Sequence, residues 1–243
     1  MFEAEIHADK LSTVSSACLA LVDECKVRLD EDGLSIQAVD AANVGMIDIA
    51  VPKEEFEQYE ADEELIGLNL VRFGDVVGMA SKDDTVALEL NEQTRKLRVE
   101  TGGLRYTLSL IDPDSIHQEP TVPDLEHIAT YSLQASDIQR GVKAAGLVSD
   151  HLAFRASANP NHLAARAEGD TDDVRDILVR GTDGPEETEE SLFSLDYMEA
   201  VVGELPDGEV TMRLGDDYPV KLDAPLFEDA ELTYLVAPRI ENE

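Results

Sequence analysis

The sequence predicts an α+β protein built from two similar domains. Apolar residues alternate with polar ones over many short stretches, as in half-buried strands, and a few longer segments show helical spacing. The order of these segments occurs twice, which indicates a duplicated domain. A proline-rich segment, which we expect to be extended, separates the halves. We therefore expect an N-terminal domain over 1–111, a connecting linker over 112–124 and a C-terminal domain over 125–243.

The composition is strongly acidic without the pattern of a disordered chain. The 243 residues include 53 Asp+Glu against 19 Lys+Arg, a formal net charge of −34, while 43% are hydrophobic. An acidic coat over an ordinary core keeps a protein hydrated in concentrated salt, where charge repulsion is screened. The sequence therefore predicts a halophilic protein that unfolds at low salt. Binding of basic partners is the alternative interpretation of the charge.

Cysteine usage and hydropathy indicate the compartment. Cys18 and Cys25 are expected on one helix as buried apolar side chains, at a spacing that excludes a disulfide and a zinc site. No apolar run reaches membrane-spanning length, and a strand pattern begins at Phe2 without a signal peptide. We expect a soluble, cytoplasmic protein.

The first half is predicted to run strand, helix, three strands, loop, strand, helix, three strands. Asp9 is the expected cap of the first helix, whose apolar spacing continues to Val22. Pro52–Glu64 is expected to be a loop, and Asn69 begins the second helix. The predicted strands are 2–7, 27–29, 34–40, 44–51, 65–68, 85–90, 96–100 and 104–111.

The second half repeats this order. A strand over 129–133 precedes a helix whose Ile138 matches Leu11 at a shift of 127, and Leu195 matches Leu70 at a shift of 125. The closing strands are predicted at 209–214, 220–222 and 231–236. Two segments, Leu104–Ile111 and Val174–Arg180, are expected at exposed sheet edges, where strands of different subunits can pair.

No catalytic motif is present. The sequence lacks a phosphate-binding loop, a zinc-protease motif, a nucleophile elbow and a dinucleotide fingerprint. Its five histidines are scattered, and its acid pairs arise freely in so acidic a chain. We predict no catalytic residue, no metal and no cofactor. An acidic metal-dependent hydrolase or transferase on the duplicated scaffold remains the alternative function.

Several motifs in order resemble those of one family. They are Met1–Ala4, the LSIQAVDAANV run at 34–44, GLNL at 67–70, the central linker, and LVAPRIE at 235–241. Together they resemble the proliferating cell nuclear antigen sliding clamps of archaea and eukaryotes. The resemblance covers the whole chain and, with the acidic composition, indicates a clamp of a halophilic archaeon.

The resemblance implies a non-enzymatic, ring-shaped homotrimer that encircles duplex DNA, with four helices per chain inside and antiparallel sheets outside. Such a ring acts as the processivity factor of DNA polymerase and as a docking platform in replication and repair. It implies contacts with DNA polymerase, a clamp loader, flap endonuclease and DNA ligase, and an association with the nucleoid. The subunit interface would contain Arg105, Tyr106, Leu108, Arg175, Ile177, Val179 and Arg180.

By the same resemblance, short partner peptides with apolar anchors dock under the linker. An exposed apolar patch on an acidic surface fits such docking, whereas closure of the domain core is the structural alternative. The matching positions are Val39, Val44, Met46, Thr121, Val122, Pro123, Pro219, Ala237, Pro238, Arg239 and Ile240.

The helices that would face DNA depart from the family pattern. Where relatives carry basic residues on the second and fourth helices, this chain has Asp75, Gly78, Asp196 and Gly203. The third helix keeps the basic pair, and three further cations add positive charge. Because molar salt weakens phosphate contacts, we expect encirclement rather than attraction to hold DNA. The predicted DNA-facing residues are Arg140, Lys143, Lys10, Arg72 and Lys82.

Overall fold

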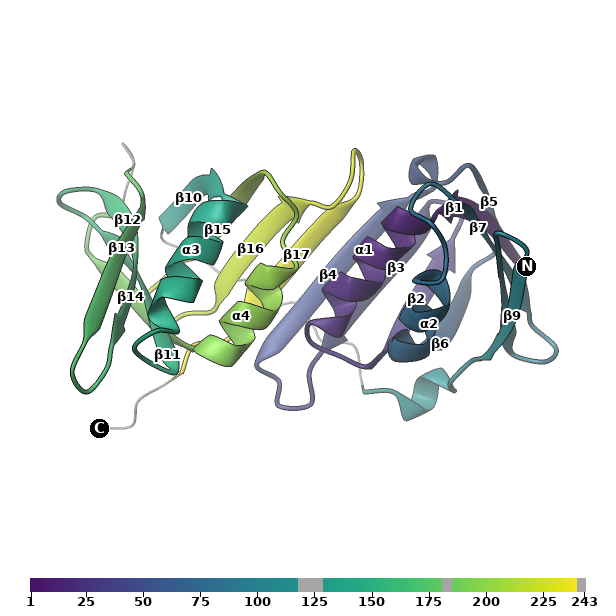
Figure 1. Cartoon of the computed structure of the whole chain (residues 1–243), viewed down its shortest axis with the longest axis horizontal. Helices are drawn as coiled ribbons and strands as arrows, with labels where there is room; N and C mark the ends of the chain where they lie inside the picture. The colour runs from purple at the N-terminus through teal and green to yellow at the C-terminus, as the bar shows by residue number, and fades with distance from the viewer. Residues whose placement is uncertain (118–128, 181–184, 240–243) are drawn as a thin grey trace. The chain divides into compact units, whose positions relative to one another are not determined.

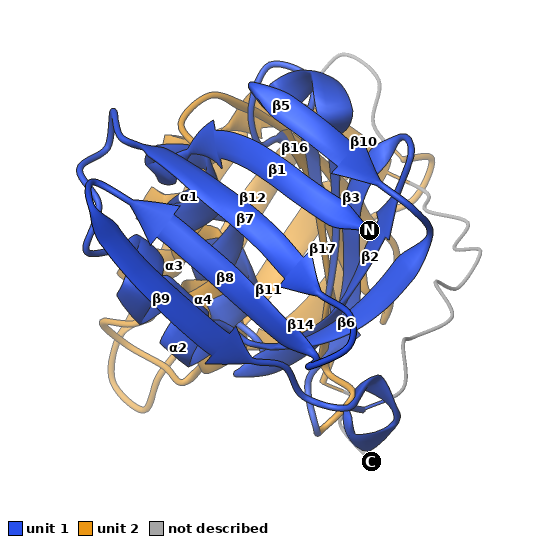
Figure 2. Ribbon diagram, turned by 90° about the vertical axis from the view of Figure 1, so that its right-hand side faces the viewer, with its two compact units in different colours: residues 1–41, 47–120, 225–232 blue, residues 42–46, 121–224, 233–243 orange. Residues whose placement is uncertain are grey.

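The computed structural model describes residues 1–117, 129–180 and 185–239, and the chain forms two compact units. Figure 1 shows helices packed against strands in each part of the chain, and Figure 2 shows the two units in separate colours. Unit 1 consists of residues 1–41, 47–120 and 225–232, and unit 2 of residues 42–46, 121–224 and 233–243.

Unit 1 contains two antiparallel groups of strands and two helices. Its helices α1 (Ala8–Leu19) and α2 (Leu70–Val77) pack against each other. One sheet has the order β5-β1-β7-β8-β9, and the other group has the order β6-β2-β3-β4. The strands are β1 (Phe2–His7), β2 (Glu24–Asp30), β3 (Gly33–Val39), β4 (Gly45–Pro52), β5 (Gln58–Ala61), β6 (Glu64–Asn69), β7 (Thr85–Asn91), β8 (Lys96–Thr101) and β9 (Leu104–Ser109).

Alternation and capping explain the first elements of unit 1. In β1, Phe2, Ala4 and Ile6 are buried, and the residues between them face outward. Helix α2 begins after Asn69, whose side chain accepts a hydrogen bond from the Arg72 N–H, as a good N-cap does. Its apolar face packs on α1 and contacts strands of both groups.

Unit 2 repeats the arrangement. Helix α3 (Ala135–Ala145) packs against α4 (Leu195–Gly203). One sheet has the order β13-β12-β11-β14, and a second group has the order β10-β15-β16-β17. The strands are β10 (Ala129–Gln134), β11 (His151–Ser157), β12 (His162–Glu168), β13 (Asp173–Val179), β14 (Glu189–Ser194), β15 (Glu209–Leu214), β16 (Val220–Pro225) and β17 (Glu231–Val236).

The predicted repeat is present in the structure. Helix α3 begins 127 residues after α1, and α4 begins 125 residues after α2. In both units the strand before the first helix pairs with the strand after the second helix, β1 with β7 and β10 with β15. The described chain therefore confirms the α+β class with four helices, none of which is long and apolar enough to cross a membrane.

Four local predictions were wrong. Helix α1 is preceded by His7, which makes no side-chain cap, and Asp9 lies in the first turn. The helix ends at Leu19, because the chain then turns and the amides of Leu21 and Val22 both donate to the Cys18 carbonyl. Within the predicted loop 52–64, residues 58–61 form β5, an edge strand paired with β1. Pro113 does not sit in an extended segment but opens a short 3₁₀ helix, η2 (Pro113–Ser115), capped by Asp112.

The two cysteines lie on different elements, Cys18 on α1 and Cys25 on β2. Both are free and fully buried, as predicted, but the single helix expected to hold them apart does not exist. The adjacent Cys25 thiol and burial raise the pKa of the Cys18 thiol well above its ordinary value. The spacing of the two cysteines therefore does not exclude a disulfide, and the structure has both thiols free.

Candidate functional site

The four described helices are almost free of the acidic excess that marks the rest of the chain. Their formal charge is −1, out of −34 for the whole sequence. Their five acids are Asp9, Asp75, Asp137, Asp196 and Glu199, and their four bases are Lys10, Arg72, Arg140 and Lys143. A polyanion approaching the exposed sides of these helices would therefore meet little of the repulsion presented by the remaining surface.

Three of the five predicted DNA-facing cations are exposed without an ion pair in the described chain. Arg72 lies in the first turn of α2, Lys82 lies in the turn after that helix, and Lys143 lies in the last turn of α3. Their charges are therefore available to a ligand.

The other two cations form ion pairs with carboxylates of their own unit. The Lys10 Nζ lies 2.5 Å from a carboxylate oxygen of Glu55, whose side chain is only 4% exposed. The exposed Arg140 bridges Asp137 at 2.6 Å and Asp176 at 2.8 Å, and these contacts raise the pKa of its guanidinium. The structure therefore separates the predicted set into available and internally paired cations.

Both strands expected at sheet edges do lie there. Strand β9 is the last strand of its sheet in unit 1, and β13 is the last strand of its sheet in unit 2. On β9, Arg105, Tyr106 and Thr107 are exposed, and the Tyr106 ring is the largest of them. Leu108 is buried in the core of unit 1, so its side chain packs inside the unit and is not available at the exposed surface of β9.

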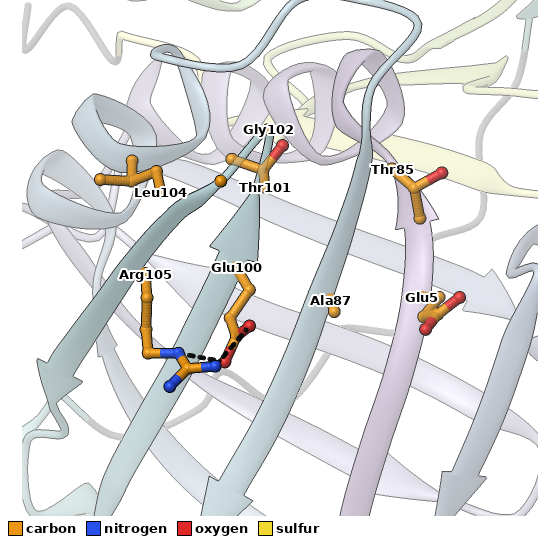
Figure 3. Close-up of a pocket in the computed structure, with 9 residues that line it drawn as sticks. Glu5, Thr85, Ala87, Glu100, Thr101, Gly102, Leu104 and Arg105 are labelled. Atoms are coloured by element: carbon orange, nitrogen blue, oxygen red, sulfur yellow. Dashed lines mark hydrogen bonds and ion pairs between the residues drawn. The ribbon is translucent and has the colours of Figure 1, made fainter.

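A shallow hollow of about 600 Å³ lies beside β9, on the outer side of the sheet (Figure 3). Glu100 and Arg105 point toward each other across its floor, with 2.7 Å between Oε1 and Nε. The Thr101 hydroxyl at its end is buried without a hydrogen-bond partner. Arg105 is therefore held within unit 1, which leaves the backbone of β9 as the main feature that a pairing strand would meet.

On β13 the predicted interface residues have three different environments. Arg175 donates to Nε2 of the buried His162, whose Nδ1 contacts the Pro160 carbonyl at 2.6 Å. Ile177 and Val179 are half-buried, and Arg180 is exposed just after the strand. The edge thus offers apolar side chains together with unpaired backbone groups.

The predicted peptide-docking residues are only partly brought together. In unit 2 the Ala237 N–H donates to the Val44 carbonyl at 2.8 Å, and the Arg239 N–H donates to the Leu192 carbonyl at 2.7 Å. Met46 is 6% exposed, so in this structure it belongs to the core. Val39, Pro219 and Pro238 are half-buried. The predictions for Thr121, Val122, Pro123 and Ile240 lie outside the described residues.

The described start of the linker is fastened to unit 1. The Ile111 N–H donates to the Gly67 carbonyl at 2.9 Å, and Ile116 is 7% exposed. A Cβ at Gly67 would lie 2.5 Å from the Ile111 carbonyl oxygen and 2.8 Å from the Ile116 side chain. Only glycine at position 67 allows the linker to start this close to β6.

Two residues that contact the C-terminal tail carry no signal in the sequence. His151 at the start of β11 contacts the Arg239 side chain, and Leu192 of β14 accepts the Arg239 N–H. A lone histidine carries no motif, and a backbone acceptor leaves no signal in side-chain chemistry. Among the described residues, no group of three or more His, Cys, Asp or Glu side chains could hold a metal ion.

Comparison with known proteins gives a consistent result. Residues 1–101 match the model of the proliferating cell nuclear antigen N-terminal domain. The chain is 48% identical to the DNA polymerase sliding clamp of Natronomonas pharaonis and 45% identical to that of Halobacterium salinarum, with full coverage of both chains in each case. A solved complex described as the C-terminal region of FEN-1 bound to A. fulgidus PCNA matches with a TM-score of 0.91 and 33% identity, covering 100% of both chains.

The fold is thus that of a DNA clamp. The chain belongs to the proliferating cell nuclear antigen family of DNA polymerase sliding clamps, and it is similar over its whole length to members from halophilic archaea. Nothing in these comparisons supports the metal-dependent hydrolase or transferase.

Proposed function

We propose that three copies of this chain form a closed ring around duplex DNA and tether replication and repair enzymes to it. The relatives and the solved clamps that match the whole chain support this function. The observation in this molecule that carries the DNA-binding part is the near-neutral charge of the four helices, since their formal charge of −1 contrasts with −34 for the chain. The clamp acts without catalysis, in the cytoplasm at the nucleoid.

Ring closure would use the two edge strands. A head-to-tail contact between β9 of one copy and β13 of the next is heterologous, and three such contacts close a ring if each rotates the chain by a third of a turn. The exposed backbone of β9, the Tyr106 ring and the half-buried Ile177 and Val179 supply pairing groups and apolar area. Arg180 adds an exposed cation next to β13.

DNA retention would depend on encirclement, with the available cations centring the duplex. Each phosphate contact contributes a slope of about −0.9 in log K against log salt, so a few cations hold DNA weakly in molar salt. Arg72, Lys82 and Lys143 are the residues available for this centring. Arg140 would act there only by exchanging Asp137 and Asp176 for phosphate.

Partner enzymes would dock through peptides at the tail of unit 2 and the linker. The contacts of Ala237 with Val44 and of Arg239 with Leu192 hold the tail in one place, next to the half-buried Pro238. Fixed backbone and apolar side chains at a chain end suit the docking of an apolar peptide anchor. The complex of a clamp with the C-terminal region of FEN-1 supports a flap endonuclease as one such partner.

The proposal is tested by loading the clamp on circular primed DNA with its loader in molar potassium chloride. Encirclement predicts that the clamp remains on the closed circle through gel filtration and is lost when the DNA is cut once. Equal retention on circular and linear DNA would contradict encirclement. For the centring role, the variant Arg72→Gln/Lys143→Gln is compared with Lys96→Gln, which removes a cation from β8 instead of a helix. Only the helix variant should reduce polymerase stimulation.

A further inference from the structure

The C-terminal tail of unit 2 is held by a side chain as well as by its backbone. Nη1 of Arg239 lies 2.5 Å from Nε2 of His151, the first residue of β11. Nδ1 of the same imidazole lies 2.5 Å from a carboxylate oxygen of Asp150. These contacts connect β11 to the tail across 88 residues of sequence.

The chemistry of the three groups fixes the direction of both hydrogen bonds. A guanidinium has donors only, so Nε2 of His151 must accept from Arg239. An imidazole that accepts at Nε2 carries its proton at Nδ1, and that N–H donates to Asp150. The His151 side chain is 23% exposed, so the contact with Arg239 is partly shielded, whereas Asp150 is 88% exposed and contributes little to its strength.

The surroundings of His151 explain why a neutral acceptor suits this position. A hollow of about 640 Å³ lies beside it, with the two arginines Arg166 and Arg239 and four acids in its lining. Arg166 is bound to Glu168 and Glu190, so it does not compete for His151. The remaining acids, Asp216 and Asp217, are exposed. An exposed ion pair to Arg239 would be screened in molar salt, whereas a hydrogen bond to a neutral ring is not.

We propose that His151 is a positioning residue for partner docking, which acts by holding Arg239 and through it the tail residues Ala237 and Pro238. The inference rests on the proposed docking function. A tail fixed before binding avoids the entropy cost of ordering it when the peptide arrives, so removal of the acceptor lowers affinity without removing any contact to the peptide. The occupant is a partner peptide with apolar anchors, and His151 itself makes no contact with it in this proposal.

The test compares His151→Leu, which removes the acceptor, with His151→Gln, whose amide oxygen can accept from Arg239. His7→Leu is the matched control, because His7 pairs with Glu57 in unit 1. Hydrogen exchange of the Arg239 amide reports the state of the tail. Titration with a C-terminal flap-endonuclease peptide in molar potassium chloride reports docking, and light scattering reports assembly.

We expect His151→Leu to exchange the Arg239 amide faster and to bind the peptide about 3- to 10-fold more weakly, with unchanged mass. His151→Gln should restore both properties, and His7→Leu should alter neither. Wild-type exchange and affinity in His151→Leu would overturn the inference. If His151→Leu fails to fold, hydrogen exchange of the residue-239 amide in Arg239→Gln decides the question, because the Arg239 side chain is exposed: faster exchange would support the inference and wild-type exchange would overturn it. A wild-type clamp that does not bind the peptide would refute the docking function, while amide exchange would still decide whether His151 holds the tail.

Discussion

In each unit an ion pair connects the first helix to the segment that follows it, but the two ion pairs differ. In unit 1, Lys10 of α1 reaches the buried Glu55 in the 3₁₀ helix η1 (Lys53–Glu55), directly after β4, and Glu55 also accepts the Asp229 N–H at 2.6 Å. In unit 2, the exposed Arg140 of α3 reaches Asp176 on β13, the third strand after its helix as β4 is in unit 1. The side chains of Lys10 and Glu55 are 26% and 4% exposed, and those of Arg140 and Asp176 are 53% and 24% exposed, so the first pair is better shielded from salt than the second. The two domains of this duplicated chain thus differ in salt sensitivity at this contact, because the Lys10–Glu55 ion pair resists salt better than the Arg140–Asp176 ion pair.

Breaking the buried ion pair should have the largest effect. Lys10→Met leaves the Glu55 carboxylate in a site that is 4% exposed, which should cost about 3 kcal/mol in the free energy of unfolding. Urea denaturation in molar potassium chloride measures this loss. The double variant Lys10→Met/Glu55→Gln should recover most of it, because no unpaired charge remains. A loss below about 1 kcal/mol would show that the buried pair is no stronger than an exposed one.

The pH dependence sharpens the same comparison. Burial alone would raise the pKa of Glu55, but hydrogen bonds from Lys10 and the Asp229 N–H hold it below its ordinary value of 4.5. A carboxyl whose pKa is lowered in the folded state stabilises that state at every pH above the ordinary pKa of the group. This stability is lost as the pH falls through the folded-state pKa. In Lys10→Met burial dominates, so acidification toward pH 4.5 should stabilise this variant relative to wild type. Parallel stability curves for the two proteins would contradict this sign.

The residue at which the first helix packs on its neighbours is a second difference between the units. The shift of 127 places Gly141 of α3 where α1 has Val14, and a Cβ at Gly141 would lie 2.8 Å from Leu178 and 2.9 Å from Ala165. Gly141→Val should therefore overpack unit 2 and cost about 1–3 kcal/mol. Val14→Gly in unit 1 is destabilising for the opposite reason, a lost side chain. A neutral Gly141→Val measured by urea denaturation would show that α3 shifts away from its sheet without cost.

The exposed ion pair should give the smallest effect. Arg140→Gln should cost about 0.2–1 kcal/mol in the free energy of unfolding at the lowest salt concentration at which the protein stays folded, and less at higher potassium chloride concentrations, where the ion pair is screened more strongly. Urea denaturation of the variant and the wild type at two salt concentrations measures the difference. A loss that persists in high salt would show that Arg140 stabilises α3 through packing instead of charge.

The fold was predictable where side-chain periodicity alone decides the structure. Phe2, Ala4 and Ile6 reveal β1, and the shifts of 127 and 125 reveal the duplication. Helix ends and edge strands were not predictable in the same way. Leu21 and Val22 continue the spacing of α1 although the chain has already turned, and β5 exists because it pairs with β1, a contact distant in sequence. Strands β11, β12 and β14 are absent from the predicted elements.

The sequence predicts which residue types belong to the candidate surfaces, but it does not predict which of these side chains are paired or buried. The sequence indicates that α3 keeps Arg140 and Lys143, yet only the structure separates Arg140, bound to two carboxylates, from Lys143, which is available. Met46 was predicted to be a docking residue, but its side chain is buried. His151 has no sequence signal, because its role depends on a tail 88 residues away.

The central claim is that three copies close into a ring, and mass measurement tests it most directly. Light scattering after gel filtration in concentrated potassium chloride should give about three times the chain mass of 26.6 kDa. A charged residue placed on the edge, Tyr106→Asp, should shift the population toward the monomer. A wild-type protein that is strictly monomeric at micromolar concentration in this salt would contradict the ring.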